Sequence, residues 1–157
     1  MQFKAYWDES HKTYSMGKIT YDNWLDKYKA VLDKCKTKVL DLGCGVGNDT
    51  LYLTERGFKV IACDYSDVAL KHLKEQLKSV ETKWLDISNP LPFKNTTFDL
   101  VIADLSLHYF DEKTTIAIMK EIKRILKPNG HLLARVNSIA DKNFGAGNGQ
   151  KIEENYY

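Results

Sequence analysis

The chain has 157 residues, 43% of them hydrophobic and 28% charged, as expected for one globular domain with a buried core. Its formal net charge is +2, and its lysines and arginines form no run longer than two, which gives no sign of a nucleic-acid-binding surface. Three cysteines without a Cys-x-x-Cys pair argue against a disulfide framework or a zinc site, and no apolar stretch suits a membrane span or an export signal, so we expect a cytoplasmic chain.

The first twenty residues are polar and aromatic and show no clear hydrophobic period. We treat residues 1–20 as an N-terminal segment whose aromatic side chains Trp7 and Tyr14 are candidates for a lid over a site. Aromatic residues that only pack in a core fit the same pattern. From residue 21 to residue 34, apolar side chains recur every three to four positions, which predicts a helix.

Short apolar runs then alternate with helical patterns. Strands are predicted at Lys38–Leu42, Lys59–Cys63, Thr82–Leu85, Phe98–Ala103 and His131–Val136. A helix over residues 48–56 is ended by Gly57, the next is capped by Ser66, and a third is capped by Asp111 and ended by a turn at Lys127–Gly130.

This alternation predicts a parallel sheet with helices on both faces, because parallel strands need crossover connections. The strands are apolar runs without alternation, as expected for strands buried on both faces. We therefore predict an α/β fold with a doubly wound, Rossmann-like, mostly parallel sheet.

A glycine-rich turn, Asp41–Gly47, joins the first predicted strand to the helix after it. Ligands of open α/β sheets bind beyond the carboxyl ends of the strands, where glycines let the backbone turn tightly and approach the ligand. The glycine spacing differs from the Gly-x-Gly-x-x-Gly of dinucleotide-binding folds. Asp41 would repel a pyrophosphate but suits a ligand with ammonium and sulfonium groups. A tight connection without a ligand fits the glycines taken alone.

Acidic residues also follow the next two strands. Asp64 comes directly after the second strand, where Rossmann-type sheets hold the acid that binds ribose hydroxyls. Asp86 ends the third strand, where a carboxylate can meet an adenine amino group. Each acid alone also fits a helix cap or an ordinary turn. Because the carboxyl ends of parallel strands share one edge of the sheet, these acids together with Asp41 favour a ligand site.

The segment VLDLGCGVGND resembles motif I of class I S-adenosylmethionine-dependent methyltransferases. Four later segments match that family in order: IACDYS resembles the ribose-binding motif, WLDIS the adenine-contacting motif, FDLVIADLSLHYF the fourth motif and LKPNGHLLARV the fifth strand with its turn. The resemblance covers about residues 30–136 and is closest to the small-molecule type, including the tellurite-resistance-like members.

The resemblance implies S-adenosylmethionine as the cofactor, S-adenosylhomocysteine as the product and a seven-stranded sheet in the order 3-2-1-4-5-7-6. It implies transfer of a methyl group to a small-molecule acceptor by direct displacement, which needs alignment and exclusion of water more than a general base. The residues that it assigns to the cofactor are Asp41, Gly43, Gly45, Gly47, Asp64, Tyr65, Asp86, Ile87 and Ala103.

Candidates for the acceptor side lie after the fourth strand, at Asp104, Ser106, His108 and Tyr109. Asp104 and His108 are the candidate catalytic residues, since a histidine accepts a proton near neutral pH. A histidine packed in a loop without a catalytic part fits the sequence as well. No metal site is expected.

After the fifth predicted strand the sequence supplies no sixth and seventh strands. Residues 137–157 read as a glycine-rich loop and tail, which leaves residues 21–136 as the cofactor-binding domain. An uncovered edge of the fifth strand carries unpaired backbone groups, so we expect self-association along this edge or marginal stability. Two other functions stay open. One is a non-catalytic S-adenosylmethionine- or S-adenosylhomocysteine-binding domain. The other is a nicotinamide-dependent oxidoreductase, which the glycine spacing and Asp41 disfavour.

Overall fold

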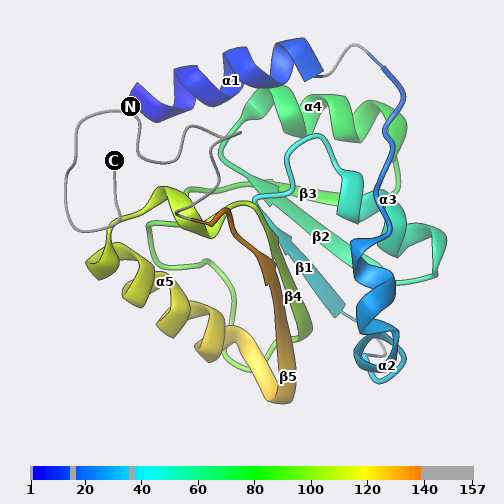
Figure 1. Ribbon diagram of the computed structural model, residues 1–157, viewed down its shortest axis with the longest axis vertical. Helices are drawn as coiled ribbons and strands as arrows, with labels where there is room; N and C mark the ends of the chain where they lie inside the picture. Colours follow the sequence, from blue (N-terminus) through cyan, green and yellow to red (C-terminus); the bar gives the residue numbers. More distant parts are fainter. Residues whose placement is uncertain (1, 15–16, 36–37, 139–157) are drawn as a thin grey trace.

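The computed structural model describes residues 2–14, 17–35 and 38–138. Five parallel strands form one sheet in the order β3-β2-β1-β4-β5 (Figure 1). The strands are β1 (Lys38–Leu42), β2 (Lys59–Asp64), β3 (Glu81–Trp84), β4 (Phe98–Asp104) and β5 (Leu126–Arg135). The predicted α/β, doubly wound, Rossmann-like fold is confirmed, and these five strands follow the order that the family resemblance implies for them.

Helices cover both faces of the sheet, because neighbouring residues of each strand point to opposite sides. The longer helices are α1 (Gln2–Tyr14), α3 (Asn48–Glu55), α4 (Asp67–Gln76) and α5 (Glu112–Ile125). On one face, Leu40 of β1 shares a buried cluster with Ile118 of α5. On the other face, the neighbouring Val39 packs with Leu53 of α3. Strands β1, β2 and β4 are therefore largely buried on both sides, which explains their apolar runs, whereas the edge strands β3 and β5 are partly exposed.

The caps predicted for two helices are confirmed. The Ser66 hydroxyl accepts a hydrogen bond from Ala69 N at 3.2 Å at the start of α4. The Asp111 carboxylate accepts one from Thr114 N at 2.7 Å at the start of α5. These caps set where both helices begin, directly after the loops that leave the carboxyl ends of β2 and β4.

The N-terminal third of the fold differs from the prediction. Residues 2–14, which show no hydrophobic period, form α1, and α1 lies alongside α4 (Figure 1). The helix predicted over residues 21–34 is confirmed only over residues 24–32, where the chain forms a 3-10 helix, η1 (Trp24–Tyr28), followed directly by the short α2 (Lys29–Leu32). The apolar period of this segment marked a buried face but did not fix the type of helix.

Strand β5 also begins earlier than the predicted His131–Val136. It runs from Leu126 to Arg135 and includes the predicted turn at Lys127–Gly130. Its pairing with β4 shifts register between Phe98 and Leu100, so the turn is an irregular part of the strand. The predicted loop and tail fall mainly on residues 139–157, which lie outside the described residues. No helix in the described ranges is long and apolar enough to cross a membrane.

Candidate functional site

A cavity of about 580 Å³ lies at the carboxyl ends of β1, β2, β3 and β4. This volume is in the usual range for small-molecule sites. The turn after β1, the residues that follow β2, β3 and β4, and the N-terminal segment all contribute to its wall. The structure thus brings together, at one edge of the sheet, strand ends that are far apart in the sequence.

The glycine turn packs closely against its neighbours. A Cβ atom on Gly43 would lie 2.4 Å from the Cβ of Ser106, and one on Gly47 would lie 2.8 Å from Cγ of Leu73. Both glycines also have positive φ angles, of 79° and 99°. Gly43 and Gly45 line the cavity, whereas Gly47 does not and instead lets α4 pack against the turn. Packing within the domain is therefore part of the reason for this glycine pattern.

Asp64 is buried at the end of β2 and ties the turn to α4. Its Oδ2 accepts a hydrogen bond from Gly45 N at 2.8 Å, and its Oδ1 accepts one from Ser66 N at 2.8 Å. Asp86 has a different environment after β3, where its Oδ1 accepts hydrogen bonds from Ser88 N and Ser88 Oγ at 2.9 and 2.6 Å. Both carboxylates line the cavity, as the sequence predicted from their places after adjacent strands.

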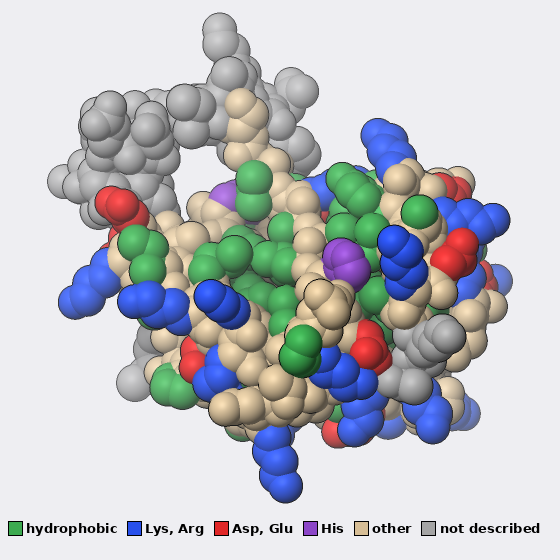
Figure 2. Space-filling model, turned by 90° about the horizontal axis from the view of Figure 1, so that it is seen from below, with side chains coloured by type: hydrophobic (Ala, Val, Ile, Leu, Met, Phe, Trp, Pro, Cys, Tyr) green, Lys and Arg blue, Asp and Glu red, His purple; other side chains and the backbone are tan. Residues whose placement is uncertain are grey.

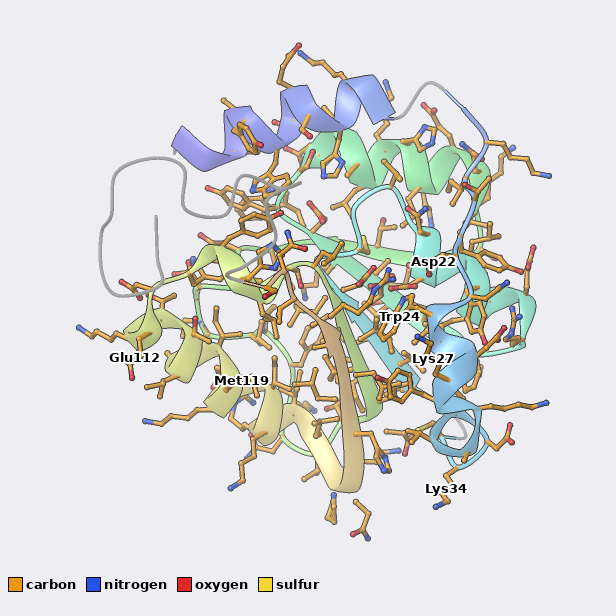
Figure 3. The ribbon with its side chains drawn as sticks, viewed as in Figure 1. Asp22, Trp24, Lys27, Lys34, Glu112 and Met119 are labelled. Atoms are coloured by element: carbon orange, nitrogen blue, oxygen red, sulfur yellow. The ribbon has the colours of Figure 1, made fainter. Side chains whose placement is uncertain are left out.

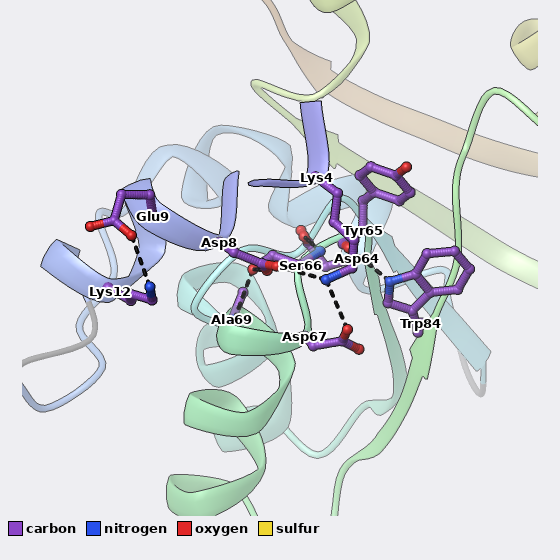
Figure 4. Close-up of polar contacts among 10 residues, drawn as sticks. All are labelled: Lys4, Asp8, Glu9, Lys12, Asp64, Tyr65, Ser66, Asp67, Ala69 and Trp84. Atoms are coloured by element: carbon purple, nitrogen blue, oxygen red, sulfur yellow. Dashed lines mark hydrogen bonds and ion pairs between the residues drawn. The ribbon is translucent and has the colours of Figure 1, made fainter. Parts of the chain in front are cut away.

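The predicted neighbours of these acids, Tyr65 and Ile87, line the same part of the cavity. The Tyr65 ring lies 5.4 Å from the Trp84 ring, between centroids, and Trp84 Nε1 donates a hydrogen bond to the Tyr65 carbonyl oxygen at 2.8 Å (Figure 4). This contact joins the loop after β2 to the end of β3. Ala103 is fully buried in β4 and is not one of the residues that line the cavity.

Asp41 forms part of the floor of the cavity. It is 1% exposed, and Thr50 Oγ1 donates a hydrogen bond to its Oδ2 at 2.6 Å. Burial and the nearby Asp49 raise the pKa of Asp41 well above its ordinary value, which favours the neutral acid.

Asp49, which the sequence analysis missed, is a third buried acid in this wall, beside Asp41 and Asp64. It is 5% exposed, and its Oδ1 accepts a hydrogen bond from Trp24 Nε1 at 2.9 Å. Burial raises the pKa of Asp49 to about 6, although the bond from Trp24 opposes this shift. Its place two residues after the last glycine of the turn was the only signal in the sequence.

An arginine joins three segments beside these acids. The Nε and Nη2 atoms of Arg135 donate to Oδ1 and Oδ2 of Asp104 at 2.6 and 2.7 Å, and its Nη1 donates to Asp22 Oδ2 at 2.7 Å. The guanidinium also lies 4.7 Å from the ring centroid of Trp24, the first residue of η1 (Figure 3). Both oxygens of Asp104 thus accept hydrogen bonds from Arg135. This geometry favours a role for Asp104 in positioning Arg135 and not in proton transfer.

The other acceptor-side candidates occupy different places. Ser106 and Tyr109 line the cavity, and the Ser106 hydroxyl donates a hydrogen bond to Leu42 O at 2.9 Å. His108 is not among the lining residues; its ring lies 4.1 Å from that of Tyr109, and its Nε2 is 3.3 Å from Nδ2 of Asn137. Burial lowers the pKa of His108, which favours the neutral ring.

The N-terminal strap, which we define as α1 together with residues 17–22, crosses the mouth of the cavity. Lys4 Nζ is 2.9 Å from Asp67 Oδ2, and Ser66 Oγ donates a hydrogen bond to Asp8 Oδ1 at 2.6 Å (Figure 4). Farther along, Gln76 accepts from Ile19 N at 2.9 Å. Both ends of α4 therefore hold the strap in place.

Of the two predicted lid residues, Trp7 lines the cavity, with its ring edge-on to Tyr109 at 4.8 Å between centroids. Tyr14 ends α1, but its side chain lies outside the described residues. The strap also contributes His11, a residue for which the sequence pattern gave no functional signal.

A second hollow, of about 490 Å³, lies between α5 and β5 at the opposite end of the sheet. Met119, Ile122 and Leu132 line it together with Lys123 and Lys127. Figure 2 shows hydrophobic side chains on this face among lysines and arginines. No acidic side chain lines this hollow within the described part of the chain, so the chemistry gathered at the strand ends is absent from it.

Comparison with known proteins places the chain in a family. The methyltransferase domain family matches residues 39–130. The demethylmenaquinone methyltransferase of Lactococcus lactis is 33% identical over 121 residues, which are 72% of this chain and 47% of that protein. The chain belongs to the methyltransferase domain family.

Solved structures agree with this assignment. The crystal structure of the PH0226 protein from Pyrococcus horikoshii OT3 matches this methyltransferase domain with a TM-score of 0.64 and 33% identity, over 70% of this chain and 53% of that one. A SAM-dependent methyltransferase of Methanosarcina mazei matches with a TM-score of 0.58 and 29% identity, over 62% and 50% of the two chains. The chain spans about half the length of these relatives.

The family match covers only part of the cavity wall. Residues 39–130 include the glycine turn and the acids after β1, β2, β3 and β4, whereas the strap and Arg135 lie outside the matched range. The methyltransferase domain therefore supplies the strand-end carboxylates, and segments outside the family match close the cavity over them.

The charge of the cavity suits a ligand with positive groups. The residues that line the cavity include six aspartates but only one lysine and one arginine, Lys18 and Arg135. The aspartates are Asp22, Asp41, Asp49, Asp64, Asp86 and Asp104. Because water is partly excluded here, this excess of acidic groups favours a bound cation, and the cation in turn favours the ionised forms of Asp41 and Asp49.

Proposed function

We propose that this methyltransferase domain binds S-adenosylmethionine in the cavity at the strand ends, and that the protein transfers its methyl group to a small-molecule acceptor by direct displacement. Family membership supports the cofactor. The observation that carries its placement is the row of carboxylates after adjacent parallel strands, beside a glycine turn, within one cavity of about 580 Å³.

Each end of the cofactor has a matching part of the wall. Asp64, held by two backbone N–H groups of the turn and of α4, is placed to accept hydrogen bonds from ribose hydroxyls. Asp86 and Ile87, after β3, suit the adenine base. The acids Asp41 and Asp49 lie along the turn from Asp64 and suit the positively charged methionine end.

The chemistry requires alignment more than proton transfer. When bound, S-adenosylmethionine supplies a methyl group on a positively charged sulfur that is already a good leaving group. The protein orients the reactants and excludes water. Trp7 of the strap and Tyr109 meet edge-on at the cavity wall, where they shield it from solvent. Asp104 holds Arg135 on this side through two hydrogen bonds, which fixes the end of β5 against β4.

A small-molecule acceptor agrees with the size of the cavity and with the absence of a long run of lysines and arginines in the sequence. A domain that binds the cofactor without turnover is the second candidate. It draws support from the engagement of Asp104 with Arg135, which leaves neither oxygen of this candidate catalytic residue without a partner. Incubation with isotopically labelled S-adenosylmethionine and a panel of metabolites separates the two, since only an enzyme transfers the label.

Calorimetric titration with S-adenosylmethionine, S-adenosylhomocysteine and NAD tests the cofactor assignment. We expect both sulfur compounds to bind and NAD not to bind. Asp64→Ala is expected to weaken S-adenosylhomocysteine binding by about 1–3 kcal/mol, the range for a lost hydrogen bond to a charged group. The control is Asp33→Ala, an exposed acid outside the cavity. Binding of NAD without S-adenosylhomocysteine would refute the proposal.

A further inference from the structure

We infer that His11 of the strap is a further cofactor-binding residue, which contacts the ligand from the side opposite Asp64. The inference rests on the proposed function, because it assumes that the cofactor lies along Gly45 and Asp64. It adds a contact from α1, outside the range that matches the methyltransferase family.

The position of the His11 ring is the first support. The ring lines the cavity, and its Cε1 atom is 3.4 Å from the point where a Cβ on Gly45 would lie. The Gly45 backbone N–H is the group that donates to Asp64 Oδ2 at 2.8 Å. His11 therefore lies directly over the part of the turn that is joined to the candidate ribose-binding acid. Stacking on Trp7, at 5.9 Å between ring centroids, orients the imidazole there.

The second support is that the imidazole has no hydrogen-bond partner. Neither ring nitrogen of His11 bonds to another described residue; Nδ1 is shielded from solvent, whereas Nε2 is not shielded in this way. The Nε2 atom is therefore the one that can bond to a ligand in the cavity, whereas the shielded Nδ1 atom, like Nδ1 of His108, cannot. His72, the other histidine in the cavity wall, differs because its Nε2 lies 2.8 Å from Nε2 of Gln76.

Asp8, the acidic residue of the strap nearest in sequence to His11 on the same helix face, already has hydrogen-bond partners. Asp8 accepts hydrogen bonds from Lys4 Nζ and Ser66 Oγ, both at 2.6 Å, and so is committed to holding α1 against α4. Burial lowers the pKa of His11, while the charges of Asp64 and Asp8 oppose this shift. Because Nδ1 is shielded, a neutral imidazole presents only Nε2 to a ligand; this atom accepts or donates according to the tautomer, and a ribose hydroxyl can serve as the partner in either case.

Two substitutions separate hydrogen bonding from packing. His11→Phe keeps a flat ring against Trp7 but removes both nitrogens, and His11→Gln places an amide nitrogen near the position of Nε2. In calorimetric titrations with S-adenosylhomocysteine we expect His11→Phe to weaken binding about tenfold, as the loss of one hydrogen bond implies. We expect His11→Gln to stay within about threefold of the unmodified protein on the same grounds.

His131→Phe is the matched control, because this histidine lies on β5 and does not line the cavity. Thermal melting of each variant without ligand shows whether folding is intact. Unchanged affinity of His11→Phe would overturn the inference and leave the proposed function standing. If the unmodified protein itself fails to bind S-adenosylhomocysteine, the proposed function fails instead, so the two outcomes are distinct.

A spectroscopic measurement on the unmodified chain avoids any effect on folding. Nuclear magnetic resonance of ¹⁵N-labelled imidazoles reports whether a ring nitrogen acquires a hydrogen bond. We expect S-adenosylhomocysteine to shift the nitrogen resonances of His11 and to leave those of His131 in place. Saturating ligand that leaves the His11 resonances unmoved contradicts the assignment.

Discussion

Asp49 shows how one buried side chain makes the stability of the domain depend on pH. Its pKa is raised from 3.8 to about 6 because burial disfavours the charged form. Between these two values the folded chain binds more protons at this site than the unfolded chain does. The contribution of Asp49 therefore favours folding as the pH falls through 6, and its ionisation costs stability above 6.

Asp49→Asn removes this ionisation and keeps an oxygen that can accept the Trp24 hydrogen bond. We expect the variant to be more stable than the unmodified chain by about 1–3 kcal/mol at pH 7.5, since each pKa unit corresponds to about 1.4 kcal/mol. The advantage should shrink steadily as the pH falls below 6. Urea denaturation at several pH values measures both free energies of unfolding.

The histidines act in the opposite direction. Burial lowers the pKa values of His11 and His108, so protonation in the unfolded chain reduces stability as the pH falls below about 6.5. Only the difference between the variant and the unmodified chain isolates Asp49. Asp33→Asn, at an exposed site, is the control and should show no such trend. An Asp49→Asn advantage that is equal at pH 7.5 and pH 5 contradicts the assignment of the shift to this residue.

Residues close to a motif were easier to predict than residues whose partners are distant. Asp64 and Asp86 could be placed in one site because each follows a recognisable strand, and parallel strands end at one edge. Arg135 could not be assigned, since its partner Asp22 is 113 positions away and belongs to a segment without a clear pattern. His11 was missed because it too belongs to a segment without a clear hydrophobic period.

At the scale of elements, the sheet was predictable and α1 was not. The central strands β1 and β4 are buried on both faces, so their apolar runs are visible in the sequence. Helix α1 packs on α4 largely through polar contacts such as Lys4 with Asp67 and Asp8 with Ser66, which leave no hydrophobic period to detect. The contribution of the strap to the cavity wall therefore could not be predicted from the sequence.

The contact between the glycine turn and α4 yields a prediction about packing. Gly47→Ala forces a side chain into a φ of 99° and places its Cβ 2.8 Å from Leu73 Cγ. We expect it to lower the free energy of unfolding by about 2–4 kcal/mol, as the sum of backbone strain and overpacking. Urea denaturation measures the loss.

Gly57→Ala separates the two causes. Gly57 also has a positive φ, of 83°, but nothing lies within 4 Å of the Cβ position. This variant should lose only about 1–2 kcal/mol, from backbone strain alone. Equal losses for the two variants would mean that the contact with Leu73 adds nothing and that the packing explanation for Gly47 is wrong.

At the scale of the whole molecule, the cavity joins the sheet to the strap. The strand ends supply the carboxylates, α4 holds the strap through Asp67, Ser66 and Gln76, and the strap covers the turn with His11. The wall of the cavity is thus built from segments at both ends of the described chain, since Arg135 of β5 also contacts Asp22 of the strap.

The other feature at this scale is the outer edge of the sheet. Strand β5 is last in the sheet order, and within the described ranges it pairs with β4 alone. Its second edge presents backbone N–H and C=O groups that can pair with another copy of the chain. We therefore predict that the 157-residue chain self-associates along β5, so that its mass by light scattering rises above 18.1 kDa as concentration increases.

Ala134→Lys tests this prediction, because Ala134 is exposed on β5 and a lysine on an edge strand opposes pairing with another strand. We expect this variant to keep the monomer mass at concentrations where the unmodified chain does not. Val136→Lys adds the same charge just beyond β5 at an exposed position, and it should associate like the unmodified chain. If the unmodified chain is monomeric at every concentration and melts cooperatively at high temperature, the free edge does not drive association. If both lysine variants dissociate equally, net charge and not strand pairing explains the effect.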